Sequence, residues 1–170
     1  MIERCDIAVV GGGMNGLTAA LALAREGLSV TMIEREAPAV LSGDGFDGRV
    51  SSIAWGSKLV LENLGAWDAM IPHAQPILEI RVSDRDAPLF LHYDHRDIGD
   101  HPLGYILENR FIRRALDAAV AAQPGITVLA PASVTAMQRD ATGADLTLAD
   151  GRALRCSLVV GCDGFRSGVR

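Results

Sequence analysis

Short apolar runs, each followed by glycine or a polar turn, divide the first part of the chain. Residues 7–10 form a continuous apolar run ending at glycine, which is typical of a strand buried in a parallel sheet. Residues 17–25 carry Ala and Leu at helical spacing, and Gly27 is placed to end that helix. Residues 28–33 are a second strand-like run, so the pattern predicts a right-handed β-α-β unit.

The rest of the chain alternates helical and strand patterns. Residues 55–70 have helical periodicity interrupted at Gly65, and residues 111–122 predict a second helix. Residues 126–129 are expected to be a strand of the parallel sheet, and residues 158–161 a buried apolar strand. Further short strands are predicted at residues 77–83, 88–92, 103–107, 132–139, 145–149 and 152–156. A hairpin turn at residues 84–87 and a loop in the polar stretch HYDHRDIGDH complete the prediction of an α/β fold.

Composition narrows the class of protein. The 170 residues have room for one domain, and 49% are hydrophobic, enough for a sizeable core. The net charge of -5 disfavours a nucleic-acid partner, which normally requires a basic surface. Three widely spaced cysteines without a secretory leader suggest reduced thiols in the cytoplasm, with Cys5 and Cys162 as small core residues. No apolar run reaches the roughly 18 residues of a membrane-spanning helix.

A glycine turn carries the candidate chemistry. Gly11 permits a sharp turn after the strand, Gly13 lets the backbone approach a pyrophosphate, and Gly16 lets the helix pack close to the strand. The amides at the helix N-terminus would face the anion. Glu34, eighteen residues after Gly16, ends the next strand, where a carboxylate accepts hydrogen bonds from a ribose and repels a 2′-phosphate. The unit predicts an adenine dinucleotide site, but the turn alone does not separate FAD from NAD.

Four sequence stretches, taken in order, distinguish an FAD site from an NAD site. VVGGGMNGLTAALALAREGLSVTMIER, DGRVSSIAWGSKLVLENLGAWD, ILENRFIRRAL and LVVGCDGFRSGVR resemble the class A flavoprotein monooxygenases, most closely the ubiquinone-biosynthesis hydroxylases. The resemblance covers essentially the whole chain. It implies a Rossmann-like FAD-binding sheet of the glutathione-reductase type with inserted antiparallel strands, incomplete at its C-terminus. Residues 72–107 would be an excursion into the substrate-side sheet.

The resemblance also implies a set of FAD-binding residues. Arg49 would contact the flavin side, Val134 would meet the adenine through its backbone, and Asp163-Gly164 would lie near the pyrophosphate groove. Asn109 and Arg113 are alternative contacts for the cofactor phosphates, with Arg110 as a third candidate. The complete expected set is Gly11, Gly12, Gly13, Met14, Asn15, Gly16, Glu34, Arg35, Arg49, Asn109, Arg113, Val134, Asp163 and Gly164.

The implied activity is hydroxylation of a phenolic ring in ubiquinone biosynthesis, with FAD as cofactor and NAD(P)H as reductant. Because the cofactor carries the chemistry, no acid, base or nucleophile is nominated, and no metal site is expected. Relatives are longer, so this chain resembles their N-terminal part and is expected to bind FAD weakly, to lack turnover alone and to self-associate. The full-length protein could meet a membrane surface or a multi-enzyme assembly. The alternatives are a non-catalytic nucleotide-binding module and a flavin-dependent reductase.

Overall fold

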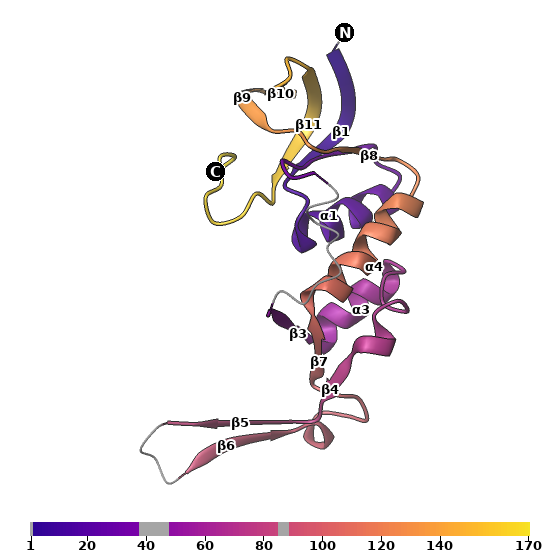
Figure 1. Ribbon diagram of the computed structural model, residues 1–170, viewed down its shortest axis with the longest axis vertical. Coiled ribbons are helices and arrows are strands. Elements are labelled where there is room, and N and C mark those ends of the chain that lie inside the picture. The colour runs from indigo at the N-terminus through magenta and orange to yellow at the C-terminus, as the bar shows by residue number, and fades with distance from the viewer. Residues whose placement is uncertain (1, 38–47, 85–88) are drawn as a thin grey trace. The chain divides into compact units, whose positions relative to one another are not determined.

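The computed structural model describes residues 2–37, 48–84 and 89–170. It divides into two compact units (Figure 1). Unit 1 comprises Met1–Asp44 and Leu116–Arg170, and unit 2 comprises Gly45–Ala115, so the division along the chain falls within helix α4. The two units are described separately below.

Unit 1 is built on a six-stranded sheet in the order β8-β2-β1-β11-β10-β9. Strands β8, β2, β1 and β11 are parallel neighbours, while β10 and β9 are antiparallel additions at one side. The strands are β1 (Ile2–Val10), β2 (Val30–Ile33), β8 (Ile126–Leu129), β9 (Val134–Asp140), β10 (Gly143–Leu148) and β11 (Ala153–Gly161). The predicted parallel core with antiparallel insertions is therefore confirmed.

Strand β11 differs from its prediction in two ways. Residues 152–156 and 158–161 were expected to be separate strands, but β11 is continuous and pairs with β1 from Ala153 to Gly161. Its first half also pairs antiparallel with β10, so one strand serves both parts of the sheet. Leu158 was expected to be buried, yet 54% of its surface is exposed. An apolar run identifies a strand, but whether another element covers it depends on the tertiary arrangement.

Helix α1 (Met14–Arg25) packs against the parallel strands of unit 1. Gly16, Leu17, Ala20, Leu21 and Ala24 form its buried stripe, because residues three and four apart share one helix face. Gly27 has φ +82°, which glycine adopts without the steric cost of a side chain and which ends the helix as predicted. A core cluster that includes Ala8, Ile33, Leu146, Leu154 and Cys156 lies in the same unit. Cys156 is thus the buried cysteine, whereas Cys5 and Cys162 are partly exposed.

Unit 2 contains a three-stranded antiparallel sheet in the order β3-β7-β4, formed by β3 (Val50–Ala54), β7 (Gly104–Glu108) and β4 (Gln75–Ile77). Helix α3 (Trp55–Asn63) ends earlier than the predicted helix, because the chain turns at Gly65, where φ is +72°. A 3-10 helix (Ile71–His73) follows the turn. Helix α4 (Asn109–Ala122) begins two residues before its predicted start.

A two-stranded ribbon of β5 (Glu79–Ser83) and β6 (Phe90–Asp94) completes unit 2 (Figure 1). The single strand predicted at residues 77–83 is divided between β4 and β5. The stretch HYDHRDIGDH was expected to be a loop, but its first three residues lie in β6 and His95–Asp97 form a 3-10 helix. Local polarity misled that prediction, because a solvent-exposed strand carries polar side chains. The predicted hairpin turn falls largely on residues 85–88, outside the described residues.

Candidate nucleotide-binding site

The glycine turn, residues 11–16, lies between the carboxyl end of β1 and the first turn of α1. The Gly11 amide donates to the Ile33 carbonyl at 2.8 Å, which joins the turn to the end of β2. Gly13 is the N-cap of α1, and no side chain caps the helix there. The first helical turn also lacks acidic residues. The amides at this helix N-terminus are therefore not neutralised by a described side chain, as an anion site requires.

Two glycines are required by backbone packing. A Cβ on Gly11 would lie 2.8 Å from the Asp163 Cα and closer still to the Cys162 carbonyl, and Gly11 also has φ +102°. A Cβ on Gly16 would lie 3.0 Å from the carbonyl carbon of Gly11 and closer to its oxygen. These two positions hold β1, α1 and the end of β11 together, so a side chain there would disturb the fold.

Gly12 and Gly13 have different surroundings. A Cβ on Gly12 would lie 3.0–3.2 Å from side-chain atoms of Glu34, so the missing side chain makes room for that glutamate. Among the residues that the structure describes, a Cβ on Gly13 would meet nothing within 4 Å. Gly13 has φ -70° and ψ 179°, which any residue can adopt. Among the described residues neither backbone strain nor packing requires a glycine at position 13; glycine is an accepted N-cap, and the bare backbone there leaves room for close approach of a ligand.

Glu34 follows β2 and points toward the glycine turn. Its Oε2 accepts a hydrogen bond from the Gly12 amide at 2.6 Å, and its Oε1 accepts one from the Glu36 amide at 2.8 Å. These bonds fix the carboxylate beside the turn while leaving lone pairs on both oxygens for a further donor. The backbone amide of Ala132 donates to the Glu34 carbonyl at 2.7 Å. The segment just before Val134 therefore lies beside Glu34. Arg35 is exposed, and its guanidinium lies 3.4 Å from the Glu36 carboxylate.

The Asp163-Gly164 pair follows β11 beside Gly11. The Cys162 amide donates to the Val10 carbonyl at 2.7 Å, which fixes this segment against the end of β1. Asp163 Oδ2 accepts the amides of Gly168 and Val169 at 2.7 and 3.2 Å, whereas Oδ1 is buried with no described partner. Burial raises the pKa of Asp163, but hydrogen bonds from Ser167 and from these amides outweigh it, so the pKa lies below its usual value. The Asp163 carboxylate is therefore held by residues 167–169, while the Asp163 backbone lies beside Gly11.

The remaining expected residues form a second set, within unit 2. The backbone amide of Asn109 donates to the Arg49 carbonyl at 3.1 Å. The Ser51 hydroxyl donates to the side-chain oxygen Oδ1 of Asn109 at 2.6 Å. Arg113 lies four residues after Asn109 on α4, so the two share one helix face. Arg110, the third candidate, lies 2.7 Å from the Glu108 carboxylate. The structure thus gathers the expected residues into two groups, one in each unit.

Two residues that shape the candidate site, Ser51 and Cys162, were not predicted from the sequence. Ser51 orients the Asn109 amide group, and its only signal was its position in DGRVSSIA. Cys162 packs its backbone against Gly11, and its signal was the strand that precedes the Asp-Gly pair. Both act through contacts between distant parts of the chain, which spacing does not reveal.

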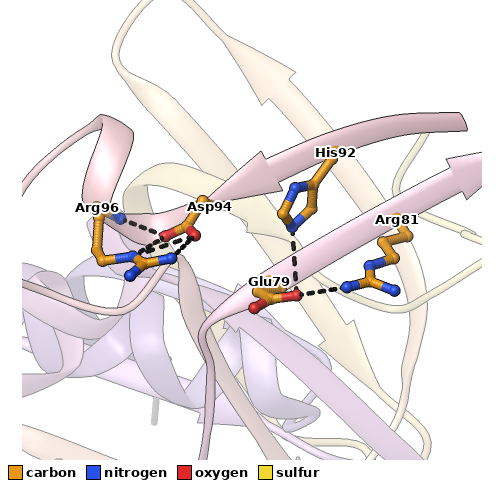
Figure 2. Close-up of polar contacts among 5 residues, drawn as sticks. All are labelled: Glu79, Arg81, His92, Asp94 and Arg96. Carbon is orange, nitrogen blue, oxygen red and sulfur yellow. Dashed lines mark hydrogen bonds and ion pairs between the residues drawn. The ribbon is translucent and has the colours of Figure 1, made fainter.

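A separate polar cluster on the ribbon bears on the expectation that no metal is bound. Ligand atoms of Glu79, His92 and Asp94 lie within 4.8 Å of one another. Figure 2 shows that an arginine contacts each carboxylate: Arg81 lies 3.2 Å from Glu79, and Arg96 bonds to both oxygens of Asp94. A cation would have to displace these guanidinium groups, so the cluster is better explained as a network of ion pairs.

The parallel sheet, the open helix N-terminus and the carboxylate beside it define a Rossmann-like nucleotide-binding domain. The chain belongs to the FAD binding domain family, whose model matches residues 4–170. None of the helices in the described ranges is sufficiently long and apolar to span a bilayer.

Two curated relatives show which members of this family the chain resembles. It is 47% identical over 165 residues to the ubiquinone hydroxylase UbiL of Rhodospirillum rubrum, covering 97% of this chain and 38% of that protein. It is 36% identical over 170 residues to the 3-demethoxyubiquinol 3-hydroxylase of Escherichia coli, covering 99% and 43%. The chain therefore spans about two fifths of the length of these relatives.

Solved structures show the same fold. The p-nitrophenol 4-monooxygenase PnpA from Pseudomonas putida matches with a TM-score of 0.80 and 23% identity, covering 99% of this chain and 43% of PnpA. The protein pqsL from Pseudomonas aeruginosa, described as a probable FAD-dependent monooxygenase, matches with a TM-score of 0.77 and 25% identity, covering 99% and 44%.

Proposed function

We propose that this chain forms the FAD-binding part of an aromatic-ring hydroxylase of ubiquinone biosynthesis that uses NAD(P)H as reductant. The observation that carries the proposal is the arrangement around Gly13: an open backbone position, uncapped helix amides and a Glu34 carboxylate fixed by the Gly12 amide. The family and the ubiquinone hydroxylases among the relatives support this assignment.

Each group of residues has a distinct role in this proposal. The backbone of residues 11–16, including Met14 and Asn15, would hold the pyrophosphate, and Glu34 would accept the ribose hydroxyls. Arg35 and the backbone of Val134 would flank the adenosine half. Arg49, with Asn109 or Arg113, would contribute polar contacts from unit 2, and Asp163-Gly164 would border the pyrophosphate groove. The bound flavin would supply the redox chemistry that the side chains lack.

The substrate side of the proposal is broader. Residues 72–107 would form part of the substrate-side sheet, and the substrate would be a small phenol, whether prenylated or not. We place the whole protein in the cytoplasm with access to a membrane surface, where a prenylated phenol would be collected. The names of the ubiquinone-pathway relatives support a phenolic substrate.

The test begins with the purified chain and added FAD. Isothermal titration with FAD, and with ADP as the smaller ligand, should show binding of both, since the pyrophosphate and ribose contacts are common to them. Binding of neither ligand would refute the proposal. Adding NADPH or NADH anaerobically to a full-length form carrying FAD should bleach the flavin absorbance. FAD binding without bleaching would favour the non-catalytic nucleotide-binding module instead.

Product analysis separates the remaining alternative. Aerobic incubation of the full-length form with NADPH and candidate phenols should yield a product heavier by one oxygen atom. Substrate-dependent NADPH consumption with a reduced but non-oxygenated product would identify a flavin-dependent reductase and refute the hydroxylase.

A further inference from the structure

Two of the three cysteines face each other across neighbouring strands of unit 1. The parallel register pairs Cys5 of β1 directly with Cys156 of β11. Side chains of paired residues leave the same face of a sheet, and Cys5 packs against the core cluster that contains Cys156. All three cysteines are free thiols. The sheet therefore holds two thiols side by side, and the proposed flavin chemistry uses neither.

Both sulfur atoms approach the same peptide group of β1. The Cys5 thiol donates a hydrogen bond to the Ile7 carbonyl at 3.3 Å, and the Cys156 thiol donates a weak one to the Ala144 carbonyl at 3.7 Å. Burial raises the pKa of the Cys156 thiol, with the neighbouring Cys5 as the next cause, while a hydrogen bond from the Ala8 amide acts in the opposite direction. The Ile7 carbonyl and the Ala8 amide belong to one peptide group, so the two sulfur atoms lie close to each other.

The strand spacing suits a disulfide between these two residues. Neighbouring strands place paired Cα atoms about 4.8 Å apart, and disulfides span Cα distances of about 4.4–6.8 Å. The two Cβ atoms start at about the same spacing and must approach to about 4.5 Å or less, so the bond would carry some strain. A strained disulfide is reduced more easily than a relaxed one, which is typical of regulatory rather than structural bonds.

A cavity in unit 1 brings solvent to both thiols. Cys5 and Cys156 both line this cavity of about 700 Å³, together with polar side chains that include Arg4 and Arg155. Cys156 is 2% exposed, whereas Cys5 is partly exposed. A small oxidant in the cavity would therefore react first with Cys5, and Cys156 would lie beside the oxidised sulfur.

We propose that Cys5 and Cys156 form a redox-sensitive pair, which a peroxide converts reversibly into a disulfide that joins β1 to β11. In a reducing compartment the pair would remain a dithiol and oxidise transiently. The two strands lead directly into Gly11 and Cys162, so the bond would cross-link the sheet just before the nucleotide-binding turn.

The reaction has two steps. The Cys5 thiolate attacks one oxygen of hydrogen peroxide, the O–O bond breaks, and the departing hydroxide is protonated to water. The Cys156 sulfur then attacks the Cys5 sulfenic acid, so that the S–S bond forms, the S–O bond breaks, and a second water leaves with the Cys156 proton. The two thiols together lose two hydrogen atoms and two electrons, and the peroxide is reduced to two waters.

Peroxide treatment of the reduced chain, followed by alkylation under denaturing conditions, tests the proposal. Three thiols should be alkylated before oxidation and one after it, since the chain has three cysteines. The oxidised monomer should be lighter by two hydrogen atoms, and excess glutathione should restore all three thiols. Peptide mapping of the full-length form after the same treatment should find Cys5 linked to Cys156.

Cysteine variants assign the bond. Cys5→Ser and Cys156→Ala should each keep both remaining thiols open to alkylation after peroxide treatment. Cys162→Ser is the matched control, because Cys162 is partly exposed like Cys5 but lies beyond the last paired residues of β1 and β11. This variant should still lose two thiols on oxidation. Circular dichroism should show that each variant is folded, and if Cys156→Ala is not, the comparison of Cys5→Ser with Cys162→Ser decides.

Three results would overturn the proposal. The first is a folded wild-type chain, or a full-length form, that keeps all its thiols open to alkylation after peroxide treatment. The second is loss of two thiols that persists in Cys5→Ser or disappears in Cys162→Ser, which would assign the bond to Cys162. The third is a non-reducing gel in which the oxidised protein runs as a cross-linked dimer, which would place the disulfide between chains. None of these measurements involves FAD, so the outcome is independent of the proposed function.

Discussion

Substituting Gly13 by alanine should separate ligand binding from stability. The new methyl group would meet no atom of the described residues within 4 Å, and the backbone at φ -70° and ψ 179° accepts alanine. Alanine restricts the unfolded chain but is a poorer N-cap than glycine, and these effects oppose each other. The free energy of unfolding of Gly13→Ala should therefore stay within about 1 kcal/mol of the wild-type value.

The same methyl group would occupy the space into which a pyrophosphate must move. Displacing the phosphate from one backbone amide loses a hydrogen bond to a charged group, which contributes about 1.5–3 kcal/mol. That loss corresponds to a dissociation constant for FAD or ADP about 10- to 150-fold higher. Gly16→Ala should behave in the opposite way, because its Cβ would overlap the Gly11 carbonyl. It should destabilise the fold by about 1–3 kcal/mol or more before binding can be measured.

Urea denaturation and isothermal titration on the same protein samples measure both quantities. Gly56→Ala is the matched control, since a Cβ there also meets nothing within 4 Å in the described part of the chain and the residue lies in α3, outside the glycine turn. It should leave ligand affinity unchanged. The reasoning is refuted if Gly13→Ala binds FAD as tightly as the wild-type chain, or if it unfolds as readily as Gly16→Ala.

Four further predictions follow from named contacts. Glu34→Ala should raise the dissociation constant for FAD about tenfold or more, because the ribose loses a charged acceptor. The control Glu36→Ala, at an exposed neighbouring position, should leave that constant unchanged. Equal effects of the two variants in titration would contradict the role of Glu34. Hydrogen bonds from Arg155 and Thr142 hold the pKa of Asp140 below its usual value, so its ionised form contributes stability above about pH 4 that is lost as the pH falls further. Asp140→Asn should therefore lower the urea midpoint at pH 7, with the difference from wild type shrinking at pH 3; a difference independent of pH would exclude this linkage. Leu146→Ala, at a core position 1% exposed, should cost about 2–5 kcal/mol in the same denaturation experiment, and a loss below 1 kcal/mol would mean that the site collapses around the cavity. The 170-residue chain with added FAD, NADPH and phenols should give no hydroxylated product by mass spectrometry, and robust turnover would contradict that expectation.

The elements with strong local signals were predicted well. The β-α-β unit was readable because a buried parallel strand is continuously apolar and an amphipathic helix repeats its apolar residues every three to four positions. Gly27 and Gly65 marked turns that the structure has, since only glycine adopts positive φ without strain. The polar stretch beginning at His92 was misjudged, because an exposed strand whose partner supplies complementary charges looks like a loop in sequence.

Some features of the candidate site were likewise predictable from the sequence, and others were not. Spacing alone indicated Gly11, Gly13, Gly16 and Glu34, because a dinucleotide turn imposes its steric demands on consecutive residues. The hydrogen bond from Gly12 to Glu34 and the packing of Cys162 against Gly11 required coordinates, since each joins segments far apart in the chain.

The sequence by itself therefore determined the fold class, the positions of most strands along the chain and the place of the glycine turn, because steric and apolar preferences act over a few neighbouring residues. Only the tertiary structure decided that β11 joins both halves of the sheet and that Leu158 is exposed. Those outcomes depend on strand register and on coverage by distant segments, and both are set by the balance of long-range packing over the whole chain.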